Sequence, residues 1–387
     1  MPDRIITNTI PTQLTVVHAY GASLGVGVTI TTAGARIANR LTSQLARMLG
    51  AASEVNRSVS GSCLCMDNDT TLHDAKPWAT TGGWVTICQN DGPGERAEQP
   101  LASKRQLAIL TPTSDLPAMG PARFESLFPV VLRAVLRRLR AGAVYGHGHS
   151  SMSYTGTWTT QTATNKNSGS GYRYTSAEGA TSRITVPAHV RPGSKLHAQW
   201  IFTHDHRPTL TFTKNGSAAG SIDLETVLAF NTTAGKQRWS PYSHEFTVNP
   251  GDVIVTTVSE TNLGAARAHF DSYSIEAETP PLVLIFKVAR FQNYDLFSTP
   301  GAGWTYEISD DDADLAESVI NDTVAEFSDV ITIDSDPILW DGDTPNTHLY
   351  DDPYHPNAWG ASLLAAEGYR EVANKLSPQR VALTGTT

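Results

Sequence analysis

The hydrophobic pattern of the chain changes twice, and its first stretch alternates strands with helices. Residues 13–19 (QLTVVHA) form a compact β-rich run, and apolar residues recur every four positions from 37 to 49, as they do on one face of a helix. Residues 83–88 (GWVTIC) predict another buried strand, and residues 121–140 predict a second helix. Strands and helices in alternation are typical of an α/β domain with a parallel sheet.

The predicted helix over residues 121–140 is amphipathic and contains a proline. Its apolar face comprises Leu132, Val135, Leu136 and Leu139, and its polar face comprises Arg133, Arg137 and Arg140. Pro129 has no backbone N–H to donate to the preceding turn, so we expect it to start or kink this helix rather than to lie inside it.

The middle of the chain, from about residue 145 to residue 278, has no helical period. Short β-rich runs follow one another there, separated by glycine, proline and asparagine. Many short strands with turn residues between them predict an antiparallel sandwich or barrel. Asn215-Gly216 lies between two such runs and is the clearest hairpin signal in the chain.

After Pro280-Pro281 the first pattern resumes. Residues 282–289 are a nearly continuous apolar run, as expected of a parallel strand that is covered on both faces. A helix over 312–327, a strand over 330–334 and a final helix over 356–376 follow. The sequence therefore predicts an α/β domain that an all-β domain interrupts.

The predicted boundaries divide the chain into four segments. Residues 1–144 and 282–377 form the two parts of the α/β domain, residues 145–281 form the inserted β-sandwich, and residues 378–387 form a C-terminal tail.

Composition and charge narrow the classes of function. The chain has 387 residues and a net charge of -9, from 29 basic and 38 acidic residues with no long basic run; a nucleic acid is therefore not an expected partner. The first residues lack the basic and apolar regions of a signal peptide, and no apolar run approaches the roughly 20 residues that span a bilayer. We expect a protein that is made without a secretion signal and has no membrane span.

Three cysteines are present, Cys63, Cys65 and Cys88. An odd and sparse set of this kind does not indicate a disulfide scaffold.

A serine follows the first predicted strand in a turn of small residues, Gly21-Ala22-Ser23-Leu24-Gly25. At the carboxyl end of a parallel strand, such a turn can expose the Ser23 hydroxyl where sheets of this kind bind ligands. Taken alone, the segment is equally well explained as a tight connection between a strand and a helix.

A histidine near the C-terminus has an aspartate three residues before it, in Asp352-Pro353-Tyr354-His355. The Asp352 carboxylate can hold one imidazole nitrogen of His355 and leave the other free to act as base on a serine hydroxyl. Asn357 suits the N-cap of the final helix. An acidic turn beside a surface histidine is the alternative.

Two further segments supply hydrogen-bond donors. Asn56-Arg57-Ser58-Val59-Ser60-Gly61 and Gln89-Asn90-Asp91-Gly92 each follow a predicted strand. The Gly61 N–H and the Asn90 side-chain amide are suitable donors to the oxyanion that forms during acyl transfer. Ordinary turn chemistry also accounts for these residue types. Residues 93–120 are polar and proline-rich, and we expect them to form a wall or lid over the site.

Taken together, the four segments resemble the blocks of the SGNH (GDSL-type) hydrolase superfamily. The blocks occur in order as GASL, NRSVSG, CQNDG and DPYHPN. The resemblance covers about residues 10–145 and 282–377, and its specificity lies in the order of all four blocks. It implies a three-layer α/β/α sandwich with a five-stranded parallel sheet, here interrupted by an all-β, jelly-roll-like antiparallel sandwich.

The resemblance also implies the role of each site residue. Ser23 would be the nucleophile, His355 the general base and Asp352 the residue that orients it. The oxyanion hole would consist of the Ser23 and Gly61 N–H groups and the Asn90 side chain.

Two residues depart from the family pattern. Ala22 replaces the usual aspartate before the serine, and Cys88 replaces the usual glycine two residues before Asn90. Neither position supplies a proton or an oxyanion donor, so the chemistry should be retained.

Metal sites are weaker candidates. His147 and His149, and likewise His204 and His206, could place imidazoles on one side of a strand, but no cysteine or carboxylate set completes them. The acidic run 310–314 follows Ser309 and precedes a helix, where a serine cap and acidic residues are favoured. We expect neither a metal nor an organic cofactor.

The inserted segment resembles carbohydrate-binding jelly-roll modules, because aromatic residues lie among its polar runs. Aromatic faces can stack on sugar rings as on other flat ligands. Trp158 and Trp200 are expected in the core, whereas Trp239 and Tyr242 lie in a polar stretch and are the candidates for binding sugar. The module could instead shape the rim of the site or form a homo-oligomer contact.

These observations predict a serine esterase that removes acyl groups, acetyl first, from an acylated complex carbohydrate such as that of a cell envelope. A chain fitted to polysaccharide but lacking a signal peptide could reach its target in a virion, as phage tail proteins with SGNH domains do, with other tail proteins as partners. A non-catalytic structural or receptor-binding adhesion protein, and a lipase or thioesterase acting on lipid acyl esters, are the alternatives.

Overall fold

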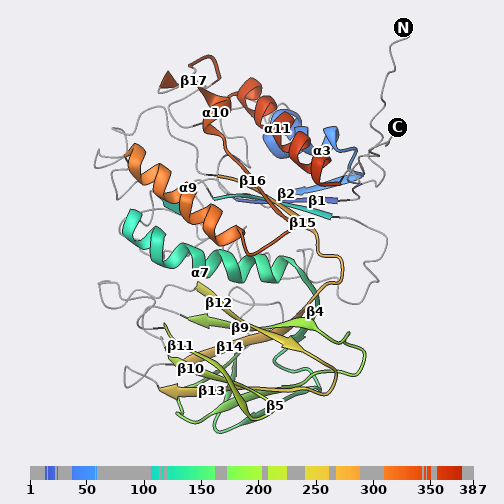
Figure 1. Cartoon of the computed structure of the whole chain (residues 1–387), viewed down its shortest axis with the longest axis vertical. Coiled ribbons are helices and arrows are strands. Elements are labelled where there is room, and N and C mark those ends of the chain that lie inside the picture. Colours follow the sequence, from blue (N-terminus) through green and yellow to red (C-terminus); the bar gives the residue numbers. More distant parts are fainter. Residues whose placement is uncertain are drawn as a thin grey trace, which may run out of the picture.

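The structure is a computed structural model of the whole chain (Figure 1). It describes residues 14, 16–21, 24, 37–56, 58, 106–112, 115–116, 120–161, 172–202, 208–224, 240–260, 267–287, 309–341, 344–345, 347–349 and 355–376. Within this part of the chain, no helix is long and apolar enough to cross a membrane.

Five parallel strands form the first sheet. They are β1 (Val16–Gly21), β2 (Ser53–Asn56), β3 (Gln106–Thr111), β15 (Leu282–Phe286) and β16 (Val330–Ile333). Their order is β16-β15-β3-β1-β2, and every neighbouring pair is parallel. The strand order reverses at β1, and the crevice beside the carboxyl end of such a strand is where open α/β sheets bind ligands.

The central strand β3 was not predicted. Its apolar run of four residues, Leu107–Leu110, lies in the segment 93–120 that we expected to form a wall or lid; all six residues of β3 are buried. A short apolar run in a polar surrounding cannot be assigned from periodicity alone. The predicted strand over 83–88 lies outside the described residues.

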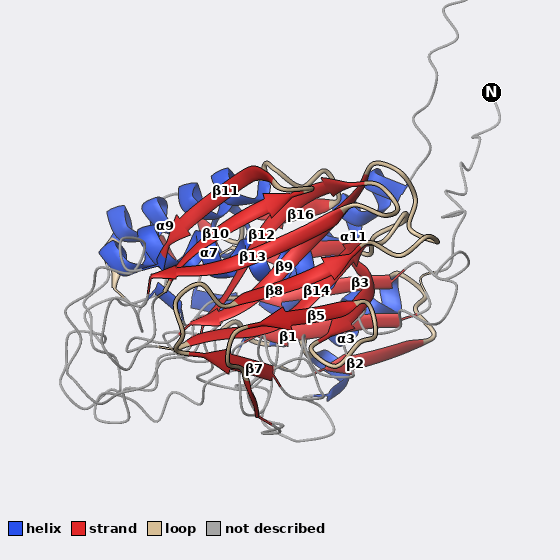
Figure 2. Cartoon of the chain, turned by 90° about the horizontal axis from the view of Figure 1, so that it is seen from below, coloured by secondary structure: helices blue, strands red, loops and turns tan. Residues whose placement is uncertain are grey.

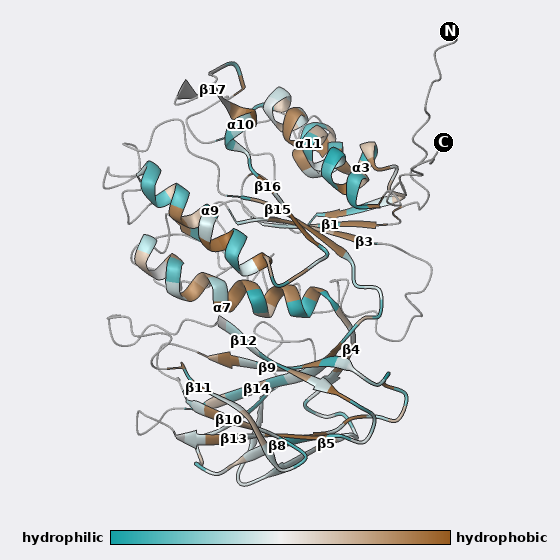
Figure 3. Ribbon diagram, viewed as in Figure 1, coloured by the Kyte–Doolittle hydropathy of each residue, from teal (hydrophilic) through white to brown (hydrophobic). Residues whose placement is uncertain are grey.

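Helices cover both faces of the parallel sheet (Figure 1). On one face lie α7 (Pro121–Leu139) and α9 (Asp310–Val324), and on the other lie α3 (Leu41–Met48) and α11 (Ala358–Leu376). Alternate residues of β3 divide between the two cores, with Ala108 and Leu110 in the first and Leu107 and Ile109 in the second. Figure 3 shows β1, β3 and β15 as largely hydrophobic, as expected of strands buried on both faces.

Helix α7 continues through Pro129, contrary to our expectation. Pro121 occupies the first turn, where a missing N–H costs nothing, but Pro129 leaves one carbonyl of the helix without its donor. Phe124, Phe128 and Leu132 are each fully buried around it, and burial of each such side chain contributes about 1.5–3 kcal/mol. This packing exceeds the roughly 3 kcal/mol cost of an internal proline.

Helices α9 and α11 begin at the predicted caps. The Ser309 hydroxyl accepts from the Asp312 N–H at 3.2 Å, and the Asp312 carboxylate accepts from the Ser309 N–H at 2.9 Å, which is a capping box. The Asn357 side-chain oxygen accepts from the N–H groups of Trp359 and Gly360, at 2.9 and 3.0 Å.

The middle of the chain forms two stacked antiparallel sheets, so the predicted β-sandwich is confirmed. Figure 2 looks onto the five-stranded sheet, whose order is β11-β10-β13-β8-β5. Its strands are β5 (Met152–Thr155), β8 (Thr181–Thr185), β10 (Thr209–Lys214), β11 (Ser217–Asp223) and β13 (Val253–Glu260).

The second sheet of the sandwich has the order β12-β9-β14-β7-β6, with β4 paired to β14. Its strands are β4 (Ala141–Gly146), β6 (Thr159–Gln161), β7 (Tyr172–Thr175), β9 (Ser194–Phe202), β12 (Ser240–Val248) and β14 (Ala268–Glu276). Because β4 belongs to this sheet, the antiparallel unit includes residues from 141 on, four residues before the predicted boundary.

Two sequence features of the sandwich have the expected structure. Asn215 and Gly216 have φ angles of 52° and 79°, the positive values required by a two-residue turn between β10 and β11. Trp200 is buried in the core, and Trp158 is half-buried with its ring 6.4 Å from that of Trp200.

Helix α7 lies between the parallel sheet and the sandwich (Figure 1). One buried cluster contains Leu132 of α7, Val283 of the parallel sheet and Ile201 of the sandwich. The inserted segment is therefore packed onto the α/β unit and is not held by a linker alone.

Four short elements follow β16. They are α10 (Asp336–Leu339), β17 (Trp340–Asp341), β18 (Thr344–Pro345) and the 3₁₀ turn η4 (Thr347–Leu349).

Candidate active site

Most predicted catalytic residues lie outside the described part of the chain. Ser23, Gly61, Asn90 and Asp352 belong to this group, as does the sugar-binding candidate Trp239. The strands and helices next to these segments are described, and they show at which edge of the sheet each segment begins.

Strand β1 ends at Gly21, two residues before Ser23. Gly21 is paired with Thr111, the last residue of β3. A Cβ at position 21 would lie only 1.8 Å from the Thr111 hydroxyl oxygen, and Gly21 has a φ of 151°. Only glycine fits this approach, so the chain enters the Ser23 turn directly beside the carboxyl end of β3.

Strand β2 ends at Asn56, the first residue of the block that contains Gly61. The Asn56 side-chain oxygen accepts from the Ser58 N–H at 2.9 Å, and its amide donates to the Thr42 hydroxyl at 2.8 Å. These bonds turn the chain at the same edge of the sheet, because β2 and β1 are parallel neighbours.

The segment around His355 is held against the start of α11. The Asn357 N–H donates to the Leu349 carbonyl at 2.7 Å, and its amide donates to the His348 carbonyl at 2.8 Å. A Cβ on Gly360 would lie 2.6 Å from that Leu349 carbonyl, so glycine allows the close approach. The half-buried His355 therefore has a fixed backbone on its C-terminal side, near the segment that leaves the carboxyl end of β16.

The third block, which contains Asn90, lies outside the described residues together with the strand predicted over 83–88. The strand that pairs with β1 on the side away from β2 is β3. Thr111 and Pro112, not Asn90, follow directly at its carboxyl end.

A lysine and three carboxylates lie at the carboxyl ends of β15 and β16. The Lys287 ammonium is 2.9 Å from Glu317 and 3.6 Å from Asp334. Oxygen atoms of Glu317, Asp334 and Asp336 lie within 4.8 Å of one another. Burial and the Asp334 charge raise the pKa of Glu317 to about 7, against the effect of Lys287. The Lys287 ammonium therefore occupies the position among these carboxylates that a metal ion would otherwise take.

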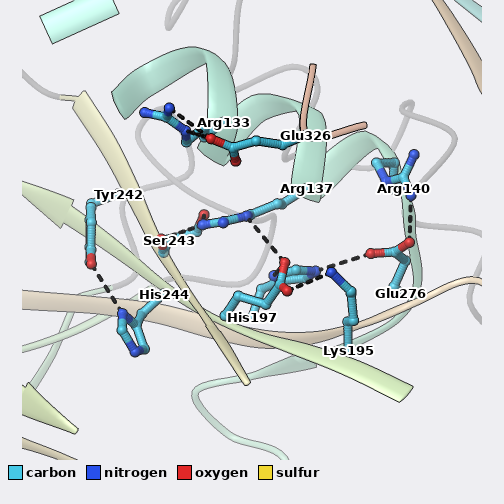
Figure 4. Close-up of polar contacts among 11 residues, drawn as sticks. Arg133, Arg137, Arg140, Lys195, His197, Tyr242, Ser243, His244, Glu276 and Glu326 are labelled. Carbon is cyan, nitrogen blue, oxygen red and sulfur yellow. Dashed lines mark hydrogen bonds and ion pairs between the residues drawn. The ribbon is translucent and has the colours of Figure 1, made fainter. Parts of the chain in front are cut away.

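A second set of charged residues joins α7 to the sandwich (Figure 4). Arg137 donates to the Ser243 carbonyl at 2.8 Å and lies 3.8 Å from Glu245. Arg140 pairs with Glu276 at 2.5 Å and also with Asp329. The arginine face of α7, predicted as a polar face, is thus turned toward the inserted sheet, and sequence periodicity could not distinguish this from a solvent-facing one.

His197 lies fully buried in the same set. Its Nε2 atom is 3.5 Å from Glu276 and its Nδ1 atom 4.0 Å from Glu245. Burial lowers the pKa of His197, although both glutamates favour its protonated form. Burial opposes ionisation of Glu276 too, but His197 and the Arg140 guanidinium outweigh it and lower the pKa of Glu276 to about 2.

These shifts predict that the protein loses stability on acidification. Glu276 has a folded pKa below the ordinary 4.5, so its contribution is complete above pH 4.5 and is lost toward pH 2. We expect unfolding by urea to show a loss of roughly 2 kcal/mol over this interval from Glu276. The Glu276→Gln variant should have a flatter profile there, whereas equal slopes for the two proteins would contradict the assignment.

The histidine acts in the same direction at higher pH. A depressed folded pKa means that the unfolded chain binds the proton more readily, so His197 lowers stability as the pH falls below 6.5. Glu317, with its raised pKa, acts in the opposite direction between 4.5 and 7. Below pH 4.5 the opposing effect of Glu317 has ended, so the wild type and Glu276→Gln are best compared in that interval.

Tyr242 is less exposed than the sequence indicated. It lies on β12, is half-buried, and packs against the sandwich core. Its hydroxyl is 3.3 Å from His244 Nδ1, and burial raises the pKa of Tyr242 to about 12. The polar stretch KQRWSPYSHE suggested exposure because the sequence does not show that Tyr242 and His244 lie on the face of β12 that packs onto the other sheet of the sandwich.

The sandwich has an open groove at the edge formed by β5 and β8. The residues that line it are of two kinds, the polar Ser150, Ser151, Ser153, Arg183 and Thr185 and the largely apolar Met152, Val186, Pro187, Ala188, Pro250 and Gly251. His149 lies next to this wall, exposed, with its Nδ1 accepting from the Ser151 N–H at 3.1 Å. Within the described residues, Glu317, Asp334 and Asp336 are the only set of three or more metal-ligating side chains close enough together to hold a metal ion.

No protein-family model matches the sequence, and no curated protein matches it. Among solved structures, a family 35 carbohydrate-binding module from Clostridium thermocellum has 16% identity and a TM-score of 0.26, with 34% of this chain and 95% of that one covered. A CBM35 from Paenibacillus barcinonensis has 15% identity and a TM-score of 0.26, with coverages of 35% and 100%.

The catalytic domain of a GH87 α-1,3-glucanase, solved with nigerose, has 11% identity and a TM-score of 0.26, with 38% of this chain and 36% of that one covered. All three TM-scores are below 0.5, and these likenesses do not enter the argument for the function of this chain.

Proposed function

We propose that the chain is a serine esterase of the SGNH type that removes acyl groups from a complex carbohydrate. The observation that supports the proposal is that β1 and β2, the strands that lead into the Ser23 and Gly61 blocks, end side by side at one edge of a parallel sheet. β1 ends two residues before Ser23, β2 ends at the first residue of the Gly61 block, and His355 lies at the start of α11. The strand order β2-β1-β3-β15-β16 reverses at β1, as at the ligand sites of open α/β sheets.

In the proposed mechanism, the Ser23 hydroxyl attacks the ester carbonyl while His355 takes its proton. The resulting oxyanion accepts hydrogen bonds from the Ser23 and Gly61 N–H groups and the Asn90 amide. His355 then returns the proton to the leaving alcohol, and an acyl-enzyme forms. Water activated by His355 releases the acid. Asp352 orients the imidazole throughout.

The carbohydrate part of the proposal rests on the sandwich. Its groove offers four hydroxyl side chains and a guanidinium group, which are suitable partners for sugar hydroxyls. Because α7 fixes the sandwich to the α/β unit, a glycan bound there would lie at a set position relative to the proposed active site. We also propose a virion tail setting for the protein, with other tail proteins as partners.

Ester hydrolysis by the purified protein tests the proposal. We expect turnover of p-nitrophenyl esters and release of the acyl group from acylated polysaccharide without added metal. Binding of the polysaccharide with no turnover of any ester would favour the adhesion alternative instead.

A further inference from the structure

Large exposed apolar side chains gather on one layer of the α/β unit. Within the described residues they are Ile37, Met48, Trp359 and Leu363, with exposed fractions of 60%, 40%, 63% and 38%. All four belong to α3, α11 or the short helical segment 37–39 before α3. Single exposed apolar residues are ordinary, but their restriction to one layer calls for a partner surface.

Two of the four, Trp359 and Leu363, lie at the start of α11, and Ile37 lies in the segment that Gln44 ties to that start. Trp359 and Leu363 are one turn apart and share a face of the helix. The Gln44 side-chain amide donates both to the Asn39 carbonyl and to the Ala358 carbonyl, the latter at 3.3 Å. One amide nitrogen therefore brings the segment that carries Ile37 next to the turn that carries Trp359.

This apolar shelf, defined as Ile37, Trp359 and Leu363, adjoins the proposed active site. Trp359 follows His355 by four residues, which limits their Cα separation to about 14 Å. The shelf lies on the α3 and α11 side of the sheet, at the edge from which the Ser23 and Gly61 segments depart.

Among the described residues, two polar side chains next to the shelf, Gln44 and Asn357, are already engaged within the protein. Gln44 is bound to two carbonyls, and Asn357 caps α11 and donates to His348. A sugar ring placed there would not find its hydroxyl partners in these two side chains, and unpaired polar groups are costly to desolvate. An alkyl chain needs no such partners and gains from burial.

We infer that the shelf of Ile37, Trp359 and Leu363 binds the alkyl chain of the ester's acyl group, which makes the substrate an ester of an acid longer than acetic acid. This inference rests on the proposed esterase function and replaces acetyl, the acyl group first expected from the sequence, with a longer one. Each methylene that is fully buried contributes about a fourfold factor in binding, and a chain lying on an open shelf gains less per carbon.

The test is the ratio of kcat/KM for p-nitrophenyl octanoate to that for p-nitrophenyl acetate. We expect a ratio of about 10 or more in the wild type, falling about tenfold in Trp359→Ser. Met48→Ser removes an exposed apolar side chain of the same layer from the far end of α3 and should leave the ratio unchanged. A ratio that is the same in the wild type and Trp359→Ser overturns the inference while leaving the esterase function intact.

A second readout does not depend on turnover. Octyl β-D-glucoside, kept below its micellar concentration, should bind the wild type more tightly than Trp359→Ser in calorimetry, and Met48→Ser should bind like the wild type. If no ester is hydrolysed but this difference is present, the proposed function fails and the alkyl site remains. If the glucoside binds equally to all three proteins, the alkyl site is wrong.

Discussion

Replacing His355 with alanine is expected to lower kcat/KM for p-nitrophenyl esters by about 10⁴-fold or more. Loss of the base of a Ser-His-Asp triad has an effect of this order, because the serine hydroxyl is then a poor nucleophile at neutral pH. The backbone on its C-terminal side is held by Asn357 and Leu349, so the substitution should leave the fold intact. The rate of p-nitrophenolate release at pH 7.5 measures the effect.

His149→Ala is the matched control for this prediction. His149 is an exposed histidine of the inserted sandwich, in a motif that could have indicated a metal site. Its replacement should leave the rate unchanged. Full activity in His355→Ala would remove the triad assignment, and equal losses in the two variants would point to a general effect of histidine removal.

The second large effect concerns stability at the junction of the two units. Arg140 pairs with Glu276 of the sandwich and with Asp329 next to β16, and the three side chains are only 9%, 17% and 14% exposed. In Arg140→Met two buried carboxylates lose their cation. Removal of one partner from a buried ion pair costs about 3–5 kcal/mol, and we expect a loss of this size in the free energy of unfolding by guanidinium chloride.

The same helix offers a matched control. Arg133 pairs with Glu326 at 2.8 Å, but these side chains are 34% and 44% exposed. Exposed pairs contribute about 0–1 kcal/mol, so Arg133→Met should be nearly as stable as the wild type. Similar losses in both variants would show that the Arg140 pair is not buried in solution. Because Arg140 bridges both units, we expect the two units to unfold together in one transition, and we expect the midpoint of that transition to move to a lower denaturant concentration in Arg140→Met.

Local signals in the sequence predicted much of the fold. Ser309 and Asn357 mark the true starts of α9 and α11 because capping depends on residues within one turn. The Asn215-Gly216 turn and the buried strand β15 were predicted for the same reason. Positive φ angles favour asparagine and glycine, and a strand buried on both faces is apolar at nearly every position, so both features can be recognised from a short stretch of sequence.

The parts that were missed depend on packing between distant segments. Pro129 is tolerated inside α7 because Phe124, Phe128 and Leu132 are buried around it. Strand β3 gains its place from β1 and β15 on either side. Arg137 and Arg140 were predicted only as part of a polar helix face, and their partners Glu245 and Glu276 lie more than a hundred residues away in the sequence. His197 could not be identified from the sequence, because its shifted pKa results from its burial between those two glutamates in the folded protein.

The candidate site was predicted from short sequence blocks. For three of them, the structure shows the strand or helix next to the block. The Ser23 and Gly61 blocks follow β1 and β2, and His355 lies at the start of α11. The Asn90 block is different, since β3 ends at Thr111. Asn90 itself lies outside the described residues.

The central claim, a serine esterase with Ser23 as nucleophile, is tested most directly by covalent trapping. The wild type would be treated with a fluorophosphonate, digested and mapped by mass spectrometry, beside His355→Ala. The account predicts one adduct, on the peptide that carries Ser23, and its loss or strong slowing in His355→Ala. No adduct, or an adduct on another serine at the same rate in both proteins, would contradict it.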